Sequence, residues 1–395
     1  MCFAAADTYE GSRGIDAPQQ LIGTVAVASS FAPADLGVAF ASCPDIHLIP
    51  STYSLGFFEQ HTYTHYALLP TKKLKKMTAS SSSKPRVPQP GIWAPAITYF
   101  DPATDELDLA SQAKYFKYLS QHLTGLVILG TNAETFLLTR EERATLVKTA
   151  RDAVGSDYPL MAGVGGHSTR QVLEYIADAA QAQADYVLVL PCAYFGKATS
   201  PKVIRNFYDE VAAKSPLPIV IYNFPGVCNG VDLDSDTIAA LAQKHQNIVG
   251  VKLTCASVAK ITRLSATLPA ETFSVFGGQS DFLLGGLASG SAGCIAAFGN
   301  VFPKTIRHIY ELYVSGKHAE ALKLHRSAAL VEGVTSKGAI AFTKFATSVT
   351  SAKSAGVEGA EERLRPRRPY EPPSDADKET IRQKMQDLIK VEDSL

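Results

Sequence analysis

The stretch Pro218–Thr254, PIVIYNFPGVCNGVDLDSDTIAALAQKHQNIVGVKLT, contains two short apolar runs separated by a loop and one amphipathic helical pattern. The runs Pro218–Asn223 and Ile248–Leu253 have the length and the β-branched content of buried strands. Each carries near its end a side chain that an apolar strand does not require, Tyr222 in the first and Lys252 in the second. The stretch therefore predicts a strand–helix–strand unit that brings a phenol close to an amine.

Lys252 is the candidate nucleophile of this unit. Removing an ammonium group from water costs several kcal/mol unless it is paired or neutralised. Burial at a strand end therefore favours the neutral amine, which attacks carbonyl groups, and a neighbouring phenol would relay protons. The alternative is a lysine that extends its ammonium to solvent beside an ordinary core tyrosine. We interpret Lys252 and Tyr222 as the chemical centre of a Schiff-base enzyme.

The composition argues against several classes of function. Lys and Arg together number 38, as do Asp and Glu, so no net field favours nucleic acid or an anionic membrane. No apolar run reaches the roughly 18–20 residues of a membrane helix. The cysteines form no C-x-x-C pair and accompany no histidine cluster, which predicts reduced thiols of an intracellular protein and no metal site. They are Cys2, Cys43, Cys192, Cys228, Cys255 and Cys294.

Residues 1–90 differ from the rest of the chain. They show no clear helical or strand period and end in the linker-like TASSSSKPRVPQPG, which predicts a disordered extension. Only Arg13 precedes Lys72, whereas a mitochondrial presequence is rich in arginine, so we expect a cytoplasmic rather than a mitochondrial protein. Met77 would make a natural start, which suggests that residues 1–76 are an over-extended gene prediction.

From Gly91 onward, strand-like apolar runs alternate with helical patterns, which is typical of βαβ units and a parallel sheet. An open doubly wound sheet is the competitor, but no G-x-G-x-x-G follows the first strand. We therefore predict a closed (β/α)8 TIM barrel over residues 91–316. The expected strands are Ile92–Tyr99, Gly125–Leu129, Leu160–Val164, Tyr186–Leu190, Ile219–Tyr222, Val249–Leu253, Phe273–Phe276 and Cys294–Ala297.

Helical patterns continue after the eighth expected strand, and residues 317–395 form a C-terminal helical segment beyond what the barrel needs to close. Helical patterns cover about Lys304–Ser315, His318–Glu332, Lys337–Ser351 and Asp375–Lys390. We expect these extra C-terminal helices to pack on the outside of the barrel.

Polar residues follow several of the expected strands, where the active sites of such barrels lie. After the second strand, the Thr131 hydroxyl and nearby backbone N–H groups could hold a small carboxylate, although an ordinary Thr/Asn turn is the alternative. The fourth strand is followed by Tyr194, a second phenol. The seventh ends in Gly277-Gly278-Gln279-Ser280, where glycines let the backbone approach a ligand closely.

These residues together resemble the dihydrodipicolinate synthase/N-acetylneuraminate lyase family of pyruvate-dependent class I aldolases, from about Ile92 to about Leu388. The motifs that carry the resemblance are G-T-N-x-E from Gly130, Y-N-x-P from Tyr222, G-V-K ending at Lys252, and the glycine pair at Gly278.

The resemblance implies roles for individual residues. Lys252 would form the Schiff base with a 2-oxo acid, Tyr222 would move protons, and Thr131 would be the hydroxyl linked to it. Tyr194 matches a tyrosine that in the family often completes this relay across a subunit contact, which implies a homo-oligomer, a dimer or a tetramer. Further candidate substrate-binding residues are Asn132, Gly278 and Ile295 for the pyruvate part, Thr254 for the distal part, and Ser280 in the loop of Gly278.

Departures from the family pattern narrow the expected reaction. Dihydrodipicolinate synthases usually carry an arginine a few residues after Y-N-x-P, but the loop Gly226–Gly230 here has no cation. Thr131-Asn132 looks more like 4-hydroxy-2-oxoglutarate and 2-keto-3-deoxy-galactonate aldolases. We therefore predict an aldolase that cleaves a 4-hydroxy-2-oxo acid to pyruvate and an aldehyde, without a metal or another cofactor. The alternatives are a dihydrodipicolinate synthase-type condensation, an N-acetylneuraminate lyase, and an inactive barrel that serves as a binding or regulatory subunit.

Overall fold

A computed structural model describes residues 87–395 of the chain. The predictions made for residues 1–76, and for the start of the linker, lie outside these residues. The barrel begins at once, because β1 (Gly91–Pro95) follows a short irregular segment.

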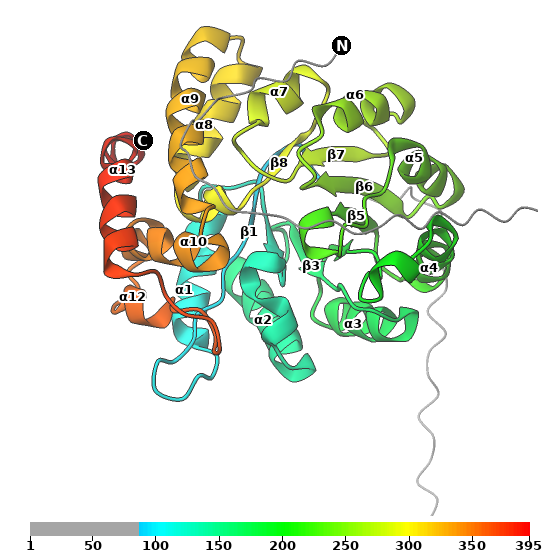
Figure 1. The fold of residues 1–395 in the computed structure, drawn as a ribbon, viewed down its shortest axis with the longest axis horizontal. Helices are drawn as coiled ribbons and strands as arrows, with labels where there is room; N and C mark the ends of the chain where they lie inside the picture. Colours follow the sequence, from blue (N-terminus) through cyan, green and yellow to red (C-terminus); the bar gives the residue numbers. More distant parts are fainter. Residues whose placement is uncertain (1–86) are drawn as a thin grey trace, which may run out of the picture. The chain divides into compact units, whose positions relative to one another are not determined.

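Eight parallel strands form a closed barrel in sequence order, as predicted (Figure 1). Neighbouring strands pair in parallel all the way round, and β1 closes the ring by pairing with β8. After β1, the strands are β2 (Gly125–Ile128), β3 (Leu160–Gly163), β4 (Tyr186–Val189), β5 (Ile219–Asn223), β6 (Ile248–Leu253), β7 (Ser274–Gly277) and β8 (Gly293–Ile295).

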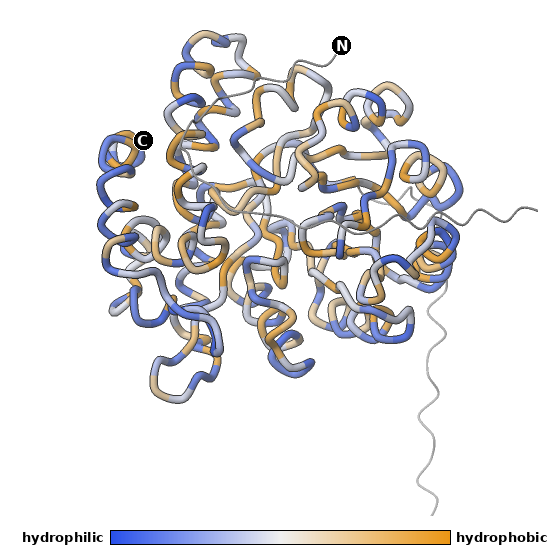
Figure 2. Tube along the Cα trace, in the orientation of Figure 1, coloured by the Kyte–Doolittle hydropathy of each residue, from blue (hydrophilic) through white to orange (hydrophobic). Residues whose placement is uncertain are grey.

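Bulky side chains fill the barrel interior. Trp93 packs edge-to-face against Tyr186 and Phe276, with ring centroids 6.2 and 6.3 Å apart. A Cβ atom at Gly125 would lie 2.4 Å from the Trp93 ring, so glycine makes room for the indole. The strands are buried on both faces, which explains why their sequences are continuous apolar runs. These strands are largely orange, the colour of hydrophobic residues, in Figure 2.

Side-chain hydrogen bonds cap the start of several outer helices. Thr139 and Glu142 form a reciprocal capping box, and Asp234 accepts a hydrogen bond from the backbone of Thr237. The helices are α1 (Leu109–Ser120), α2 (Arg140–Val154), α3 (Thr169–Gln181), α4 (Pro201–Lys214), α5 (Ser235–Lys244), α6 (Val258–Thr267), α7 (Leu283–Ala288) and α8 (Pro303–Val314).

Extra C-terminal helices pack against one side of the barrel, as predicted (Figure 1). They are α9 (His318–Thr335), α10 (Ala339–Ser348), α11 (Ser351–Ser354), α12 (Ala360–Arg363) and α13 (Asp375–Ser394). Glu392 of α13 accepts hydrogen bonds from the backbone of Lys304 and Thr305, at 3.0 and 2.7 Å, and so caps α8 from outside. The division of the chain at residues 316 and 317 stays a prediction.

Short 3-10 turns follow several strands at the carboxyl end of the barrel. They are η1 (Thr131–Ala133), η2 (Thr135–Leu137), η3 (Gly196–Ala198), η4 (Pro225–Val227) and η5 (Ala297–Asn300). The strand expected at Cys294–Ala297 ends at Ile295 in the structure, because the chain then turns into η5.

Candidate active site

Lys252 and Tyr222 lie side by side at the carboxyl ends of β6 and β5. The parallel register pairs the two residues directly, and the Lys252 Nζ atom lies 4.3 Å from the centroid of the Tyr222 ring. Lys252 is 2% exposed and Tyr222 is 3% exposed. Within the part of the chain that the structure describes, Lys252 forms no ion pair, so the amine is buried against an aromatic face.

The Tyr222 phenol reaches the loop that follows β2. Its hydroxyl lies 3.3 Å from the Thr131 Oγ1 atom, and either group can donate. Thr131 begins η1, and the Thr98 hydroxyl holds this turn by donating to the Ala133 carbonyl at 2.8 Å. The fold thus brings together the amine, the phenol and the hydroxyl that the sequence predicted as neighbours.

Asn223 fixes the strand end that carries Tyr222. Its side chain is fully buried, donates to Asp232 at 2.7 Å and accepts from the Leu233 backbone at 2.9 Å. Asp232 is in turn paired with Lys260. Sequence reasoning assigned Asn223 no role, although the Y-N-x-P motif contains it. These bonds hold the end of β5 in one position.

Gly278 and Thr254 lie against each other on the other side of Lys252. The Gly278 N–H donates to the Leu253 carbonyl at 2.9 Å, and a Cβ atom at Gly278 would lie 2.1 Å from the Thr254 Oγ1 atom. That Oγ1 atom is buried and has no hydrogen-bond partner among the described residues. A buried hydroxyl without a partner is uncommon in folded proteins, which makes this atom a candidate polar group of the site.

The other predicted binding residues differ in their surroundings. Ile295 ends β8 and belongs to the same buried apolar cluster as Tyr222. Asn132 is half-buried in η1, next to Thr131. Ser280 is buried, and its hydroxyl already donates to Glu332 of α9 at 2.5 Å.

Tyr194 is not brought to the Lys252–Tyr222 pair within one chain. It is 68% exposed and lies against His167, with ring centroids 5.6 Å apart. Phe195 packs on Tyr194, and Phe136 stacks on His167. These four residues form an exposed aromatic cluster, which sequence reasoning did not foresee beyond Tyr194.

A buried ion pair joins the Thr131 loop to the C-terminal segment. Lys344 of α10 is fully buried and donates to Glu134, which is 5% exposed. The second carboxylate oxygen of Glu134 accepts the Arg367 backbone N–H at 2.7 Å. Burial lowers the pKa of Lys344, and the Glu134 carboxylate opposes that effect. Glu134 stands in the G-T-N-x-E motif, but nothing in the sequence pointed to Lys344 as its partner.

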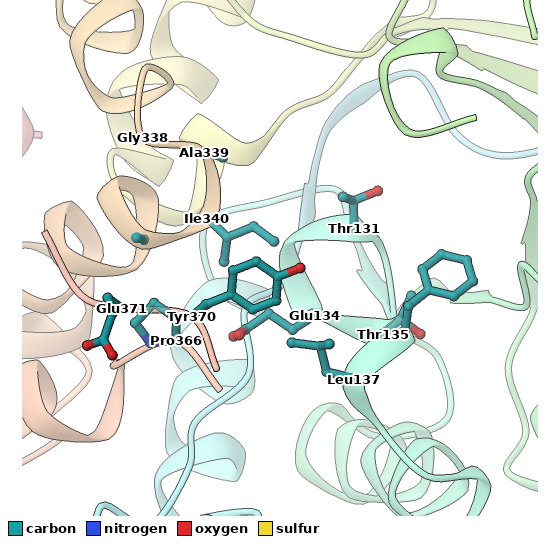
Figure 3. Close-up of a pocket in the computed structure, with 12 residues that line it drawn as sticks. Thr131, Glu134, Thr135, Leu137, Gly338, Ala339, Ile340, Pro366, Tyr370 and Glu371 are labelled. Atoms are coloured by element: carbon teal, nitrogen blue, oxygen red, sulfur yellow. The ribbon is translucent and has the colours of Figure 1, made fainter. Parts of the chain in front are cut away.

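A pocket of about 380 Å³ lies between this loop and the C-terminal segment. Figure 3 shows Thr131 and Glu134 on one side, and Ile340 and Tyr370 from the C-terminal segment on the other. The Tyr370 side chain extends into the space between Ile340 and Glu134. The C-terminal segment thus helps to build the surroundings of a predicted site residue.

No group of three His, Cys, Asp or Glu side chains between 87 and 395 is arranged to hold a metal ion. Over the same range, no helix has the length and apolarity to cross a membrane.

The chain is similar to two named aldolases. A protein of Coccidioides immitis (strain RS), named "Putative 4-hydroxy-2-oxoglutarate aldolase, mitochondrial", is 67% identical over 312 residues, which cover 79% of this chain and 99% of that protein. The L-threo-3-deoxy-hexylosonate aldolase of Aspergillus niger is 35% identical and covers 78% of this chain and 97% of its own length.

Solved structures agree with the fold. The structure titled "Crystal structures of a putative dihydrodipicolinate synthase family protein from Coccidioides immitis" has a TM-score of 0.75 and 64% identity, and the match covers 79% of this chain and all of that one. YagE of Escherichia coli K12, solved in complex with pyruvate, has a TM-score of 0.68 and 27% identity, over 76% of this chain and 98% of YagE.

The expected cytoplasmic location is wrong by these comparisons. The Coccidioides relative and a 36% identical protein of Emericella nidulans, "Probable 4-hydroxy-2-oxoglutarate aldolase, mitochondrial", are both named as mitochondrial. The expectation rested on the few basic residues before Lys72, and a low count of arginine proved a poor guide.

The family model described as "Dihydrodipicolinate synthetase family" matches residues 89–388, which include the whole barrel and most of the C-terminal helices. With the 67% identical relative covered almost end to end, this match identifies the chain as a member of the dihydrodipicolinate synthetase family.

Proposed function

We propose that Lys252 is the Schiff-base nucleophile of this enzyme and that Tyr222 and Thr131 move the protons of the reaction. The enzyme is a pyruvate-dependent class I aldolase, a lyase that acts on small 2-oxo acids. The observation that carries the residue assignment is the direct pairing of Lys252 with Tyr222, whose hydroxyl reaches Thr131.

The reaction begins with attack of the neutral Lys252 Nζ on C2 of a 4-hydroxy-2-oxo acid. The Tyr222 hydroxyl gives its proton to the leaving water as the iminium ion forms, and the resulting phenolate takes the proton of the C4 hydroxyl as the C3–C4 bond breaks. The electron pair of that bond moves to the iminium nitrogen, the aldehyde leaves, and the enamine is protonated at C3. Water then releases pyruvate and restores the amine. The iminium nitrogen is the electron sink, so the proposed reaction needs no metal and no cofactor besides the lysine adduct.

Substrate binding follows from the groups around the amine. The turn at Thr131 and Asn132 would hold the substrate carboxylate, and Gly278 and Ile295 would border the pyruvate part. The Thr254 hydroxyl, which has no hydrogen-bond partner among the described residues, would bind the distal part of the substrate. Ser280 would not contact the substrate through its hydroxyl, which donates to Glu332, but would fix the position of the loop that carries Gly278.

The proposed substrates are 4-hydroxy-2-oxoglutarate and 2-keto-3-deoxy sugar acids such as L-threo-3-deoxy-hexylosonate. The names of the two relatives described above support both. The loop Gly226–Gly230 contains no cation, which disfavours aspartate semialdehyde as the second substrate of a condensation. A sialic acid substrate stays the alternative within the family.

A second copy of the chain would supply Tyr194. Tyr194 is 68% exposed and contacts His167 and Phe195, and this aromatic cluster offers an apolar surface to a second chain. We therefore propose a homo-oligomer, a dimer or a tetramer, in which Tyr194 extends the relay from Thr131.

Borohydride trapping tests the nucleophile. The protein is incubated with pyruvate and borohydride, digested, and the adduct is mapped by mass spectrometry, with Lys252→Ala as the test variant and Lys148→Ala, at an exposed lysine, as the control. We expect the adduct on Lys252 in the wild type and in Lys148→Ala, and none in Lys252→Ala. An adduct on another lysine would overturn the assignment, and no adduct at all would favour a binding role over catalysis.

A substrate panel tests the reaction. It contains 4-hydroxy-2-oxoglutarate, the 2-keto-3-deoxy acids of galactonate and gluconate, L-threo-3-deoxy-hexylosonate, sialic acid, and aspartate semialdehyde with pyruvate. Pyruvate release from one of the 4-hydroxy-2-oxo acids, at a kcat/KM well above that for sialic acid, is the expected result. Faster condensation of aspartate semialdehyde would contradict the proposed direction and substrate class.

A further inference from the structure

Helix α9 holds the loop after β7 by two side chains that lie on the same face of the helix. Glu332 accepts both donors of Ser280, the N–H at 3.1 Å and the hydroxyl at 2.5 Å. His325, two turns earlier, donates from Nε2 to the Ser280 carbonyl at 2.7 Å. Every polar group of Ser280 is therefore engaged by α9.

The same loop forms one wall of the candidate active site. Gly278, two residues before Ser280, donates to Leu253 and leaves no space for a side chain beside Thr254. Gly278 and Thr254 are proposed to border the pyruvate part and the distal part of the substrate. A shift of Ser280 would therefore move backbone that lines the site.

Glu332 is a buried carboxylate without a cationic partner. It is 5% exposed, and no Lys or Arg side chain between residues 87 and 395 forms an ion pair with it. Burial raises the pKa of Glu332 to about 7, and the negative charge of Asp281 acts in the same direction, while the hydrogen bonds from Ser280 oppose the shift. The ionisable groups that face it are Asp281 in the loop, Cys294 on β8 and His325 on α9 itself.

We propose that Glu332 is a positioning residue, which fixes the Gly278–Ser280 loop in its binding geometry when it is ionised and loosens that loop when it is protonated. This inference rests on the proposed function. The ionised carboxylate can accept from the Ser280 N–H and hydroxyl together. In a protonated carboxyl, one oxygen donates to the Ser280 hydroxyl oxygen instead of accepting from it, so the bond is no longer assisted by the negative charge.

The consequence is a substrate affinity that depends on pH. As the pH rises through about 7, Glu332 ionises, the loop is held more firmly and KM falls. Loss of one charge-assisted hydrogen bond predicts roughly a tenfold higher KM at low pH. The value of kcat should change much less, because Glu332 does not touch Lys252, Tyr222 or Thr131.

The experiment compares pH profiles of KM and kcat between pH 5.5 and 8.5 for four proteins. Glu332→Gln mimics the protonated carboxyl at every pH, since its amide NH2 donates where the acid would. His325→Gln keeps a donor for the Ser280 carbonyl but does not titrate. Glu320→Gln removes an exposed carboxylate from the same helix. The fourth protein is the wild type.

We expect the wild type, His325→Gln and Glu320→Gln to show the step in KM, and Glu332→Gln to have the high KM of the acid form throughout. The proposal is overturned if Glu332→Gln keeps the step or has the wild-type KM at pH 8. It is also overturned if the step disappears in His325→Gln, because the imidazole would then be the titrating group.

Folding is checked by thermal denaturation at pH 8. Because the pKa of Glu332 is raised in the folded protein, the unfolded chain releases this proton first as the pH rises from 4.5 to about 7, and stability falls over that window. Glu332→Gln should therefore melt no lower than the wild type at pH 8. Ser280→Ala, which removes the hydroxyl from the other side, should also raise KM at pH 8, and a wild-type KM there would contradict the proposal.

Borohydride trapping at Lys252 separates this inference from the proposed function. If wild-type Lys252 is not labelled, the proposed function fails. If Lys252 is labelled and the four profiles coincide, only the role of Glu332 fails.

Discussion

At the scale of single residues, the hydroxyl pair of Tyr222 and Thr131 is the feature most open to a direct test. Tyr222→Phe keeps the ring against the Lys252 amine but removes the group that takes the C4 hydroxyl proton. We expect kcat for cleavage to fall by roughly 10²- to 10⁴-fold, the usual contribution of general acid–base catalysis. Steady-state kinetics measure the loss, and borohydride trapping with pyruvate should still label Lys252.

Thr131→Val is the matched variant for the same hydrogen bond. It retains the shape of the side chain and removes the oxygen that lies 3.3 Å from the Tyr222 hydroxyl. Its effect on kcat should be smaller than that of Tyr222→Phe, since Tyr222 itself exchanges protons with the substrate and Thr131 acts through the Tyr222 hydroxyl. Equal wild-type rates for both variants would exclude this pair from the proton transfer.

Part of the site could be predicted from the sequence because it depends on adjacent strands. Tyr222 and Lys252 end two consecutive apolar runs, and parallel strands bring their carboxyl ends to one rim. The partner of Glu134 could not be predicted in this way, since Lys344 lies on a helix 210 residues later and follows no periodic signal. The hydrogen bond from the Ser280 hydroxyl to Glu332 could not be predicted from the sequence either, because it depends on how α9 packs against the barrel.

At the scale of elements, a buried ion pair between Glu134 and Lys344 connects α10 to the loop of Thr131. Glu134 also accepts a hydrogen bond from the Arg367 backbone. Lys344→Met leaves the Glu134 carboxylate buried without its cation. Breaking a buried pair from one side costs about 3–5 kcal/mol, so we expect a loss of unfolding free energy of that order. Denaturant unfolding measures the loss, and kcat should fall with it because Thr131 begins the loop that is released.

The double variant Glu134→Gln with Lys344→Met provides the control within the pair. It removes both charges and should recover much of the lost stability, since the penalty comes from the unpaired charge rather than from the missing bond. The exposed pair of Lys148 and Asp152 is the external control, where Lys148→Met should cost only about 0.5 kcal/mol or less. Similar losses at both sites would refute the structural role of the buried pair.

At the scale of the whole molecule, the exposed aromatic cluster of Phe136, His167, Tyr194 and Phe195 lies around the loops that follow the barrel strands. Tyr194 and Phe195 are 68% and 78% exposed, which is unusual for neighbouring large side chains at one place. Aromatic residues are enriched in subunit interfaces, and the proposed role of Tyr194 needs a second copy. Both arguments point to self-association through this cluster.

Phe195→Asp tests that association, because it places a charge in the middle of the cluster, where the partner would have to desolvate it. We expect analytical ultracentrifugation to show a dimer or tetramer for the wild type and a shift toward monomer for the variant. The kcat of the variant should fall with the oligomer, since Tyr194 would no longer reach the relay of a second chain. Leu330→Asp is the matched control, because Leu330 is equally exposed but lies on α9, away from the cluster. If Leu330→Asp dissociates the protein and Phe195→Asp does not, the subunits meet through the C-terminal helices, and the relay must be completed within one chain.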